Sequence, residues 1–365
     1  MNIYFASAYI YERPAKIAKA LQLAGHSVFL FHLHDTSDTE FKGCFNYIFR
    51  ASSTTEIDLL IERLGVKFIH IFSKDHDPLA MYLVSAKKCI TIYDYKDIFE
   101  ELIEIKYPET TYKNQEFLII NSDYIVHRDF QIKPYLKLKK IIKINNFYYP
   151  DLVWPNNNPC FLPYSEPIKL VLIGNFTIEK IAPQWAGLGY IKIFKSLLDQ
   201  NFSIDVYPTC PDAYNKESFS EYIELSKSNK NFTIHNALPI KELNEELKNY
   251  HFGLVLTQAQ HFENLNMYVK KILLRVGNAT RCMDYIGAGL PIIFTQELKQ
   301  ISIINKKYQI GIGLTGSDLF NLKEKIKLHD YNHLRNSVIK ISKLQLNSMY
   351  WVNKLISFYS EIIKK

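Results

Sequence analysis

Short apolar runs alternate with amphipathic stretches along most of the chain, and this alternation predicts a parallel sheet with crossover helices. Before residue 150, the apolar runs predict strands, and stretches with an apolar period of three to four predict helices. The predicted strands are Asn2–Ala6, Ser27–His32, Phe68–Phe72, Cys89–Tyr93 and Tyr124–His127. The predicted helices are Pro14–Ala24, Thr55–Leu64, Pro78–Ala86 and Tyr112–Asn121. This order of elements is typical of a Rossmann-like unit.

Prolines and asparagines crowd the stretch from 145 to 167. Because proline opposes both a helix interior and an internal strand, we place an interdomain linker there. The alternation then restarts. The predicted strands are Lys169–Ile173, Ser203–Tyr207, Phe232–His235, Phe252–Thr257 and Pro291–Phe294, and the predicted helices are Tyr190–Asp199, Ile240–Asn249, Thr280–Gly287 and Leu319–Leu328. We therefore expect a first domain at 1–150, a linker at 151–168, a second Rossmann-like domain at 169–332 and a helical tail at 333–365.

Composition and charge narrow the class of protein. Hydrophobic residues make up 47% of the 365 residues, which excludes disorder as the default. Five scattered cysteines and the absence of a basic, apolar leader lead us to expect a cytoplasmic protein. The net charge of +7 comes with no nucleic-acid-binding motif, so we expect no nucleic-acid partner. A lysine run from Lys133 to Lys143 is either a solvated face or a peripheral contact with anionic membrane, and both interpretations stay open.

The segment from Asn278 to Ile293 carries the strongest indication of chemistry. It predicts a helix that begins near Asn278 or Thr280, followed by Gly-x-Pro and a buried strand. A helix N-terminus presents unpaired N–H groups and partial positive charge, which suit a diphosphate. Asp284, about one turn into this helix, is placed to bind hydroxyl groups of the same ligand. An ordinary helix–turn–strand unit with a capping asparagine also explains these residues.

The same segment resembles the donor-binding helix of GT-B glycosyltransferases of the group-one, family 4-like type, whose signature ends in A-x-G-x-P-V-I. The resemblance implies that Asp284, at the place of the second of two family glutamates, holds the nucleotide ribose. Thr280 and Arg281 resemble the Thr-Lys pair of a subset that reads K-x-x-x-Y-x-x-x-G-x-P. The first family glutamate has no counterpart, because its place falls at Val276 or Gly277. The resemblance favours retention of configuration, and the missing glutamate leaves the donor and the stereochemistry open.

Three further segments support the resemblance. His235-Asn236-Ala237, followed by the predicted helix Ile240–Asn249, resembles the strand, turn and nucleobase-side helix of the family. The strand that ends at Gly174 is similar to the first strand and glycine turn of the family's C-terminal domain, which faces the phosphates. The terminal stretch with Trp351 and Tyr359 is similar to the family helix that crosses back onto the N-terminal domain. The resemblance therefore implies a donor site made of Gly174, Asn175, Thr177, Thr280, Arg281 and Asp284.

Polar residues that follow strands of the N-terminal half are the candidates for the acceptor side, because ligands of open α/β sheets bind beyond the carboxyl ends of strands. We select His76 and Asp94 as catalytic candidates, since they fall where the resembling family places acceptor-side polar residues. A histidine there is a general base or a hydrogen-bonding partner of a sugar hydroxyl, and a structural role is the alternative. Two groups of candidate ligands, His32-Leu33-His34-Asp35 and Asp75-His76-Asp77, match no known metal spacing. We therefore expect neither a metal ion nor a cofactor.

The resemblance implies an α/β fold of two Rossmann-like domains that face each other across a cleft, the GT-B architecture. It implies a glycosyltransferase that moves a sugar from a nucleoside-diphosphate sugar to a glycan, lipid-linked or protein acceptor in bacterial surface polysaccharide or glycoconjugate synthesis. Two alternatives stay open. One is a sugar-nucleotide epimerase of the same fold, and the other is a degenerate module that binds a sugar or a partner without turnover.

Overall fold

The computed structural model describes residues 1–8, 10–33, 40–72, 78–95, 109–128, 145–174, 176, 190–210, 212–256, 280–315 and 317–364. The chain divides into two compact units, and the final helix belongs with the first of them. Unit 1 comprises Met1–Pro155 and Asn347–Lys365, and unit 2 comprises Asn156–Leu346.

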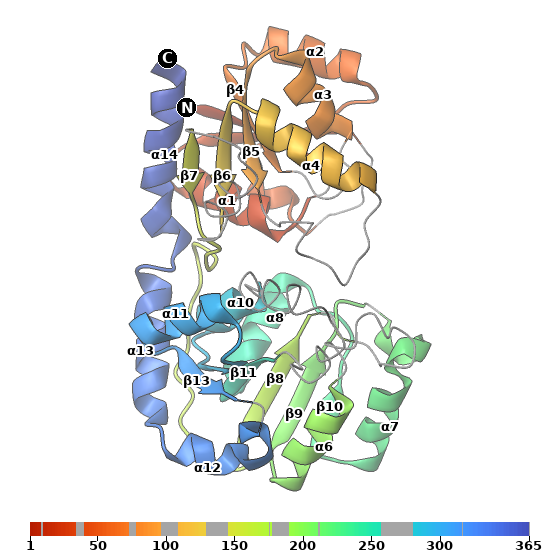
Figure 1. The fold of residues 1–365 in the computed structure, drawn as a ribbon, viewed down its shortest axis with the longest axis vertical. Helices are drawn as coiled ribbons and strands as arrows, with labels where there is room; N and C mark the ends of the chain where they lie inside the picture. The colour runs from red at the N-terminus through yellow and green to blue at the C-terminus, as the bar shows by residue number, and fades with distance from the viewer. Residues whose placement is uncertain are drawn as a thin grey trace. The chain divides into compact units, whose positions relative to one another are not determined.

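Unit 1 is built on a seven-stranded sheet in the order β3-β2-β1-β4-β5-β6-β7, and every neighbouring pair is parallel (Figure 1). Its inner strands are rich in β-branched and aromatic residues and are almost wholly buried, as both faces of a parallel sheet are covered. The strands are β1 (Asn2–Ser7), β2 (Ser27–His32), β3 (Tyr47–Arg50), β4 (Phe68–Phe72), β5 (Ile90–Tyr95), β6 (Tyr124–His127) and β7 (Asn146–Tyr148).

Helices cover both faces of this sheet, and a separate apolar core lies under each layer. One core joins β1, β2 and β4 to α1 (Glu12–Leu23) and to the terminal helix α14 (Ser348–Lys364). The other core packs α2 (Thr54–Arg63), α3 (Pro78–Ala86) and α4 (Glu109–Asn121) on the opposite face.

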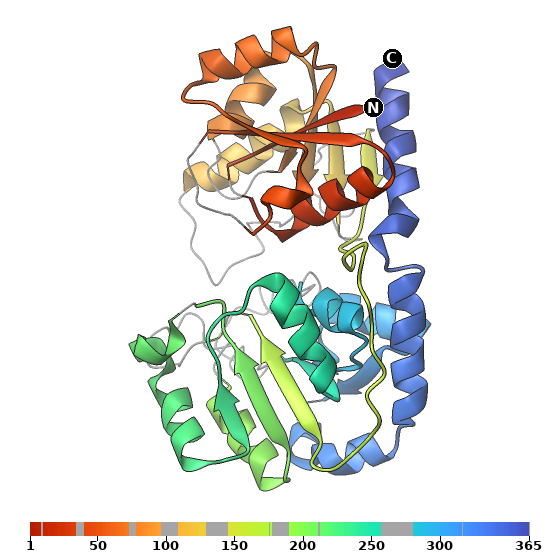
Figure 2. The same cartoon turned by 180° about the vertical axis from the view of Figure 1, so that it is seen from behind.

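The terminal helix α14 packs on the N-terminal half of the chain, as its apolar stripe predicts. It lies beside α1, and Val352, Leu355, Tyr359 and Ile362 are buried in the shared core (Figures 1 and 2). The Trp351 ring meets the Tyr149 ring edge-on, with centroids 6.2 Å apart. The prediction that the chain crosses back onto its first half is confirmed.

Unit 2 holds a six-stranded, wholly parallel sheet in the order β10-β9-β8-β11-β12-β13. The chain builds outward from β8 to β10 and then returns to the other side of β8, so the strand order reverses between β8 and β11. Ligands of open α/β sheets bind at such a reversal. The strands are β8 (Lys169–Ile173), β9 (Ser203–Tyr207), β10 (Phe232–Ile234), β11 (Phe252–Val255), β12 (Ile292–Thr295) and β13 (Gly311–Leu314).

The helices of unit 2 also lie on both faces of their sheet. The main apolar core packs α6 (Ile191–Asp199), α7 (Ser220–Ser228) and α12 (Leu322–Lys327) against the even-numbered residues of β8, such as Leu170 and Leu172. The opposite layer contains α8 (Ile240–Glu246) and α10 (Arg281–Ala288), which contact each other. The remaining helices are α11 (Lys299–Tyr308) and α13 (Tyr331–Lys343).

The predicted α/β fold class with two Rossmann-like units is confirmed, and the structure adds elements that the pattern did not indicate. The strands β3, β7 and β13 lie at sheet edges, and β13 carries two glycines, which weaken the apolar pattern of a strand. The tail predicted from His333 is two helices, because the backbone at Leu344 (φ −118°, ψ −103°) leaves the helical region. The cleft expected between the two domains stays a prediction.

Candidate functional site

A glycine turn and an arginine meet at the strand-order reversal of unit 2. Gly174 follows β8 with φ +98°, a left-handed conformation that glycine adopts without strain, and its N–H donates to the carbonyl of Tyr207 at 2.9 Å. The Arg281 guanidinium lies directly against it. A Cβ added at Gly174 would stand 3.2 Å from Nη2 of Arg281 and 3.4 Å from Cζ. The glycine therefore lets the guanidinium approach the backbone at the end of β8.

Helix α10 brings Arg281 to this corner because Arg281 is the first residue of the helix. It begins at Arg281, directly after Thr280, and its acidic residue Asp284 lies in the first turn, where negative charge is favourable. Asp284 is buried, with 7% of its surface exposed. Gly289 ends the helix with φ +86°, and the next N–H, of Leu290, donates to the carbonyl of Tyr285 at 2.8 Å.

An imidazole and a phenol stack beside the glycine turn. The rings of His235 and Tyr207 are parallel within 3°, with centroids 4.2 Å apart. His235 Nε2 is 2.6 Å from Oδ1 of Asp205, and the Tyr207 hydroxyl is 3.1 Å from that of Tyr250. Burial raises the pKa of Tyr207. Since Tyr207 also accepts from Gly174, this stack belongs to the same corner, which we call the β8–α10 corner.

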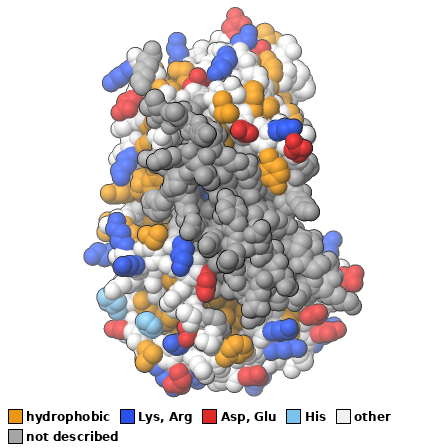
Figure 3. Space-filling view, in the orientation of Figure 1, with side chains coloured by type: hydrophobic (Ala, Val, Ile, Leu, Met, Phe, Trp, Pro, Cys, Tyr) orange, Lys and Arg blue, Asp and Glu red, His pale blue; other side chains and the backbone are white. Residues whose placement is uncertain are grey.

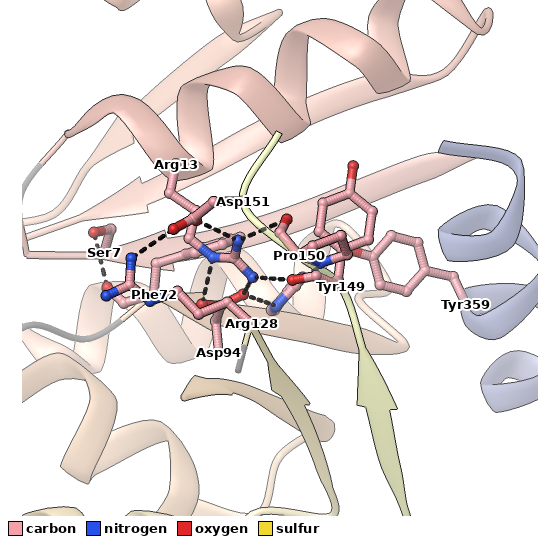
Figure 4. Close-up of polar contacts among 10 residues, drawn as sticks. Ser7, Arg13, Phe72, Asp94, Arg128, Tyr149, Pro150, Asp151 and Tyr359 are labelled. Atoms are coloured by element: carbon pink, nitrogen blue, oxygen red, sulfur yellow. Dashed lines mark hydrogen bonds and ion pairs between the residues drawn. The ribbon is translucent and has the colours of Figure 1, made fainter. Parts of the chain in front are cut away.

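Unit 1 holds a second polar cluster, centred on Arg13 of α1 (Figure 4). The Arg13 guanidinium donates to both carboxylate oxygens of Asp94, at 2.9 and 3.0 Å, and to Oδ1 of Asp151 at 3.0 Å. It also donates to the carbonyl of Tyr149 at 3.0 Å. Arg128 reaches the other oxygen of Asp151 at 2.6 Å. These four charged side chains, which we call the Arg13 cluster, expose at most 8% of their surface.

A histidine connects the Arg13 cluster to the terminal helix. His70 of β4 is wholly buried, with Nδ1 2.6 Å from the Tyr359 hydroxyl and Nε2 3.5 Å from Oδ2 of Asp94. Burial lowers the pKa of His70, and the neighbouring carboxylate only partly opposes this. Burial alone would raise the pKa of Asp94, but the charge of Arg13 holds it below its ordinary value. At neutral pH, His70 is therefore neutral and Asp94 is ionised.

The structure brings four of the predicted donor-site residues to one region, since Gly174, Thr280, Arg281 and Asp284 all lie at the β8–α10 corner. Asn175 and Thr177 lie outside the described residues, as does the catalytic candidate His76. Among the described residues no group of three or more His, Cys, Asp or Glu is arranged to hold a metal ion.

The catalytic candidate Asp94 lies inside β5 and not in the loop that was expected to follow a strand ending at Tyr93. Its exposed fraction is 0%, and Arg13 occupies both of its oxygens. This geometry favours a structural role for Asp94, and its catalytic role stays a prediction.

Sequence reasoning did not select Arg13 or Asp151. Arg13 is 81 residues from Asp94 and 138 from Asp151 along the chain, so no local pattern links them. Nor did it assign a role to Tyr285, which is buried beneath the corner. In Figure 3, Lys and Arg side chains are interspersed with Asp and Glu side chains over the coloured parts of the face. The basic run Lys133–Lys143 lies outside the described residues.

Comparison with known proteins finds one family model and a known fold. Residues 201–357 match the family model described as Glucosyltransferase 3-like, C-terminal domain. No curated protein matches the chain in sequence.

Three solved structures illustrate the fold. A glycosyltransferase from Rickettsia africae is similar at 14% identity over 100% of this chain and 99% of that one, with a TM-score of 0.64. Sucrose-phosphate synthase from Thermosynechococcus elongatus is similar at 12% identity over 99% of both chains, with a TM-score of 0.65. HepE from Anabaena in complex with UDP is similar at 10% identity over 99% of this chain and 100% of that one, with a TM-score of 0.66. The chain has the GT-B fold, and the match to the glucosyltransferase 3-like model covers most of unit 2 and the first part of α14.

Proposed function

We propose that this protein is a glycosyltransferase that takes a sugar from a nucleoside-diphosphate sugar, and that the β8–α10 corner binds the diphosphate of the donor. The observation that carries the proposal is the contact between the Arg281 guanidinium and the Gly174 turn at the N-terminus of α10. The family match over residues 201–357 supports the reaction class.

The corner suits a diphosphate for physical reasons. The first turn of a helix offers N–H donors and partial positive charge, and a guanidinium forms two parallel hydrogen bonds to phosphate oxygens. Negative charge grows on the leaving diphosphate as the glycosidic bond breaks. Fixed donors at that position stabilise the transition state without a metal.

The remaining assignments of the donor site follow the same proposal. Asp284, one turn below Arg281, would accept hydrogen bonds from ribose hydroxyls, and Asn175 and Thr177 would add polar contacts beside Gly174. A uridine nucleotide is the first choice of donor to try, because HepE is described with UDP and with UDP and glucose.

We propose that unit 1 binds the acceptor and that His76 accepts the proton of the acceptor hydroxyl. The acceptor class we propose is a glycan, a lipid-linked glycan or a protein, as in bacterial surface polysaccharide or glycoconjugate synthesis. Asp94 would support this side structurally, by holding Arg13 through both of its carboxylate oxygens.

The experiment is a calorimetric titration of UDP, UDP-glucose and uridine into the full chain, followed by an assay of nucleoside-diphosphate release. Tight binding of UDP with weak binding of uridine supports a diphosphate site. Release of UDP that requires an added acceptor supports transfer, whereas isomerised sugar without free UDP indicates an epimerase. Binding without either product indicates a degenerate binding module, and absence of UDP binding contradicts the proposal.

We also propose peripheral contact with anionic membrane through Lys133–Lys143. No helix within the described residues is both long and apolar enough to span a bilayer. Co-sedimentation with liposomes should rise with anionic lipid content and fall with salt, because the attraction is screened over about 10 Å at 0.1 M salt. Indifference to lipid charge would leave this segment as a solvated face.

A further inference from the structure

Strands β8 and β11 lie at the reversal of strand order, and their pairing is short. Their ladder consists of Leu170 with Phe252 and Val171 with Gly253, whereas β8 pairs with β9 over five residues. In a parallel ladder the next hydrogen bond would run from the N–H of Ile173 toward the carbonyl of Leu254. A side chain from α10 stands in that place instead.

The hydroxyl of Tyr285 lies between the two strands. It accepts from the N–H of Ile173 at 2.9 Å, and it is 3.3 Å from the carbonyl oxygen of Leu254 and 3.2 Å from that of Val171. The side chain is wholly buried, so the hydroxyl replaces a backbone bond that no water would supply. One phenolic oxygen thus joins the ends of two strands.

A glycine in β11 makes room for the tyrosine ring. A Cβ added at Gly253 would stand 2.3 to 2.6 Å from ring carbons of Tyr285, closer than any side chain tolerates. The ring therefore lies flat against the β11 backbone. The missing side chain at Gly253 therefore lets α10, which carries Tyr285, pack close to the sheet.

Arg281 and Tyr285 share one face of α10, because residues four apart on a helix are neighbours. Tyr285 bonds Ile173, and Arg281 contacts the next residue, Gly174. The last residue of β8 and the glycine that follows it are thus tied to two successive turns of one helix. A shift of Tyr285 would carry the guanidinium away from the glycine turn.

We infer that Tyr285 is a positioning residue for the diphosphate site: by inserting its hydroxyl between β8 and β11, it holds Arg281 and the first turn of α10 against Gly174. This inference rests on the proposed function. Tyr285 itself does not contact the substrate, and it affects binding only through Arg281.

The test is a double-mutant cycle of Tyr285→Phe and Arg281→Gln, read by UDP binding. Tyr285→Phe keeps the ring and leaves the Ile173 N–H without its partner, so we expect roughly tenfold weaker UDP binding. If Tyr285 acts through Arg281, the double variant binds UDP no more weakly than Arg281→Gln alone. Tyr331→Phe is the matched control, because its hydroxyl also donates to a backbone carbonyl, that of Leu162, and its ring packs against Phe252 at the far end of β11. It should leave UDP binding unchanged.

Equal UDP affinity in Tyr285→Phe and the wild type, or fully additive losses in the double variant, would overturn the inference and leave the proposed function standing. A wild-type chain that binds no nucleoside diphosphate would overturn the proposed function itself.

Hydrogen exchange on the wild type provides a second measurement if Tyr285→Phe does not fold. UDP should slow exchange at the Ile173 amide by severalfold, because ligand binding tightens the contact between α10 and β8. Unchanged exchange there with UDP bound would overturn the inference.

Discussion

Each of the two parallel sheets of this protein has a polar cluster near the carboxyl ends of its strands, yet the two clusters are built in opposite ways. In the Arg13 cluster two guanidinium groups face two carboxylates, and all four side chains are buried. At the β8–α10 corner a partly exposed guanidinium lies beside a glycine turn and the start of a helix, which both favour anions. The first arrangement pairs its buried charges with one another, whereas the second places a guanidinium at the first turn of a helix. We therefore assign stability to the first and anion binding to the second.

The largest expected effect concerns the Arg13 cluster. Arg13→Ala leaves the buried Asp94 without its main partner and Asp151 with Arg128 alone, which costs about 3–5 kcal/mol of unfolding free energy. Urea unfolding of the full chain measures this loss. Tryptophan fluorescence in a Trp185→Phe background reports on unit 1, because Trp154 and Trp351 both belong to it.

The matched control is Lys19→Ala, which removes another basic side chain of α1 without a charged partner of this kind. It should change the unfolding free energy by less than about 0.5 kcal/mol. UDP binding by folded Arg13→Ala should equal that of the wild type. A small loss of stability combined with a large loss of UDP binding would reverse the roles assigned to the two clusters.

The second effect concerns Arg281. Arg281→Gln should weaken UDP binding by about 1.5–3 kcal/mol, the range for a hydrogen bond to a charged group, with little change in unfolding free energy. Calorimetry with UDP measures it, and Lys306→Gln removes an equal charge from the exposed C-terminal end of α11 as a control. Unchanged affinity in Arg281→Gln would mean that the corner does not bind the diphosphate.

The third effect is a pH dependence of unit 1. Burial holds the pKa of His70 below 6.5, so below that pH the unfolded chain binds a proton that the folded chain does not bind. Stability is therefore full above about pH 6.5 and falls as the pH drops toward the folded pKa, by at most about 1.4 kcal/mol per pH unit. Asp94, Arg13 and Tyr359 face the imidazole.

Urea titrations between pH 7 and pH 5 measure this slope in the Trp185→Phe background. His70→Gln retains a group that can bond the Tyr359 hydroxyl but cannot take up the proton, so it should flatten the slope. A slope that is equal in both proteins would show that His70 is not the titrating group.

The smallest effect concerns Asp284. If its carboxylate holds the ribose, Asp284→Asn should weaken UDP binding by about 1 kcal/mol and leave pyrophosphate binding unchanged. Competition of both ligands against a fluorescent nucleotide separates the two. Equal losses of affinity for UDP and pyrophosphate would show that Asp284 acts through its charge in the first turn of α10 and does not bind the ribose.

The comparison also explains which features could be predicted from the sequence. The alternation of apolar runs predicted both Rossmann-like units because strands such as Phe68–Phe72 are buried on both faces and contain almost no polar residue. The Gly174 turn and the start of α10 could be predicted because their signals are local: a glycine after a strand, and a helix that ends at Gly289.

The Arg13 cluster could not be predicted because its members are joined by the fold alone. Arg13 and Asp94 belong to a helix and a strand 81 residues apart, and nothing near Asp94 distinguishes a buried ion pair from an exposed catalytic carboxylate. The Tyr285 hydroxyl was missed for the same reason, since its partners Ile173 and Leu254 lie 112 and 31 residues away.

The most direct test of the account is a crystal structure of the full chain with UDP. We predict diphosphate oxygens within about 2.7–2.9 Å of the Arg281 guanidinium, beside Gly174 and the first turn of α10. The ribose should face Asp284. A diphosphate bound away from Arg281, or UDP seated against unit 1 near the Arg13 cluster, would contradict the account.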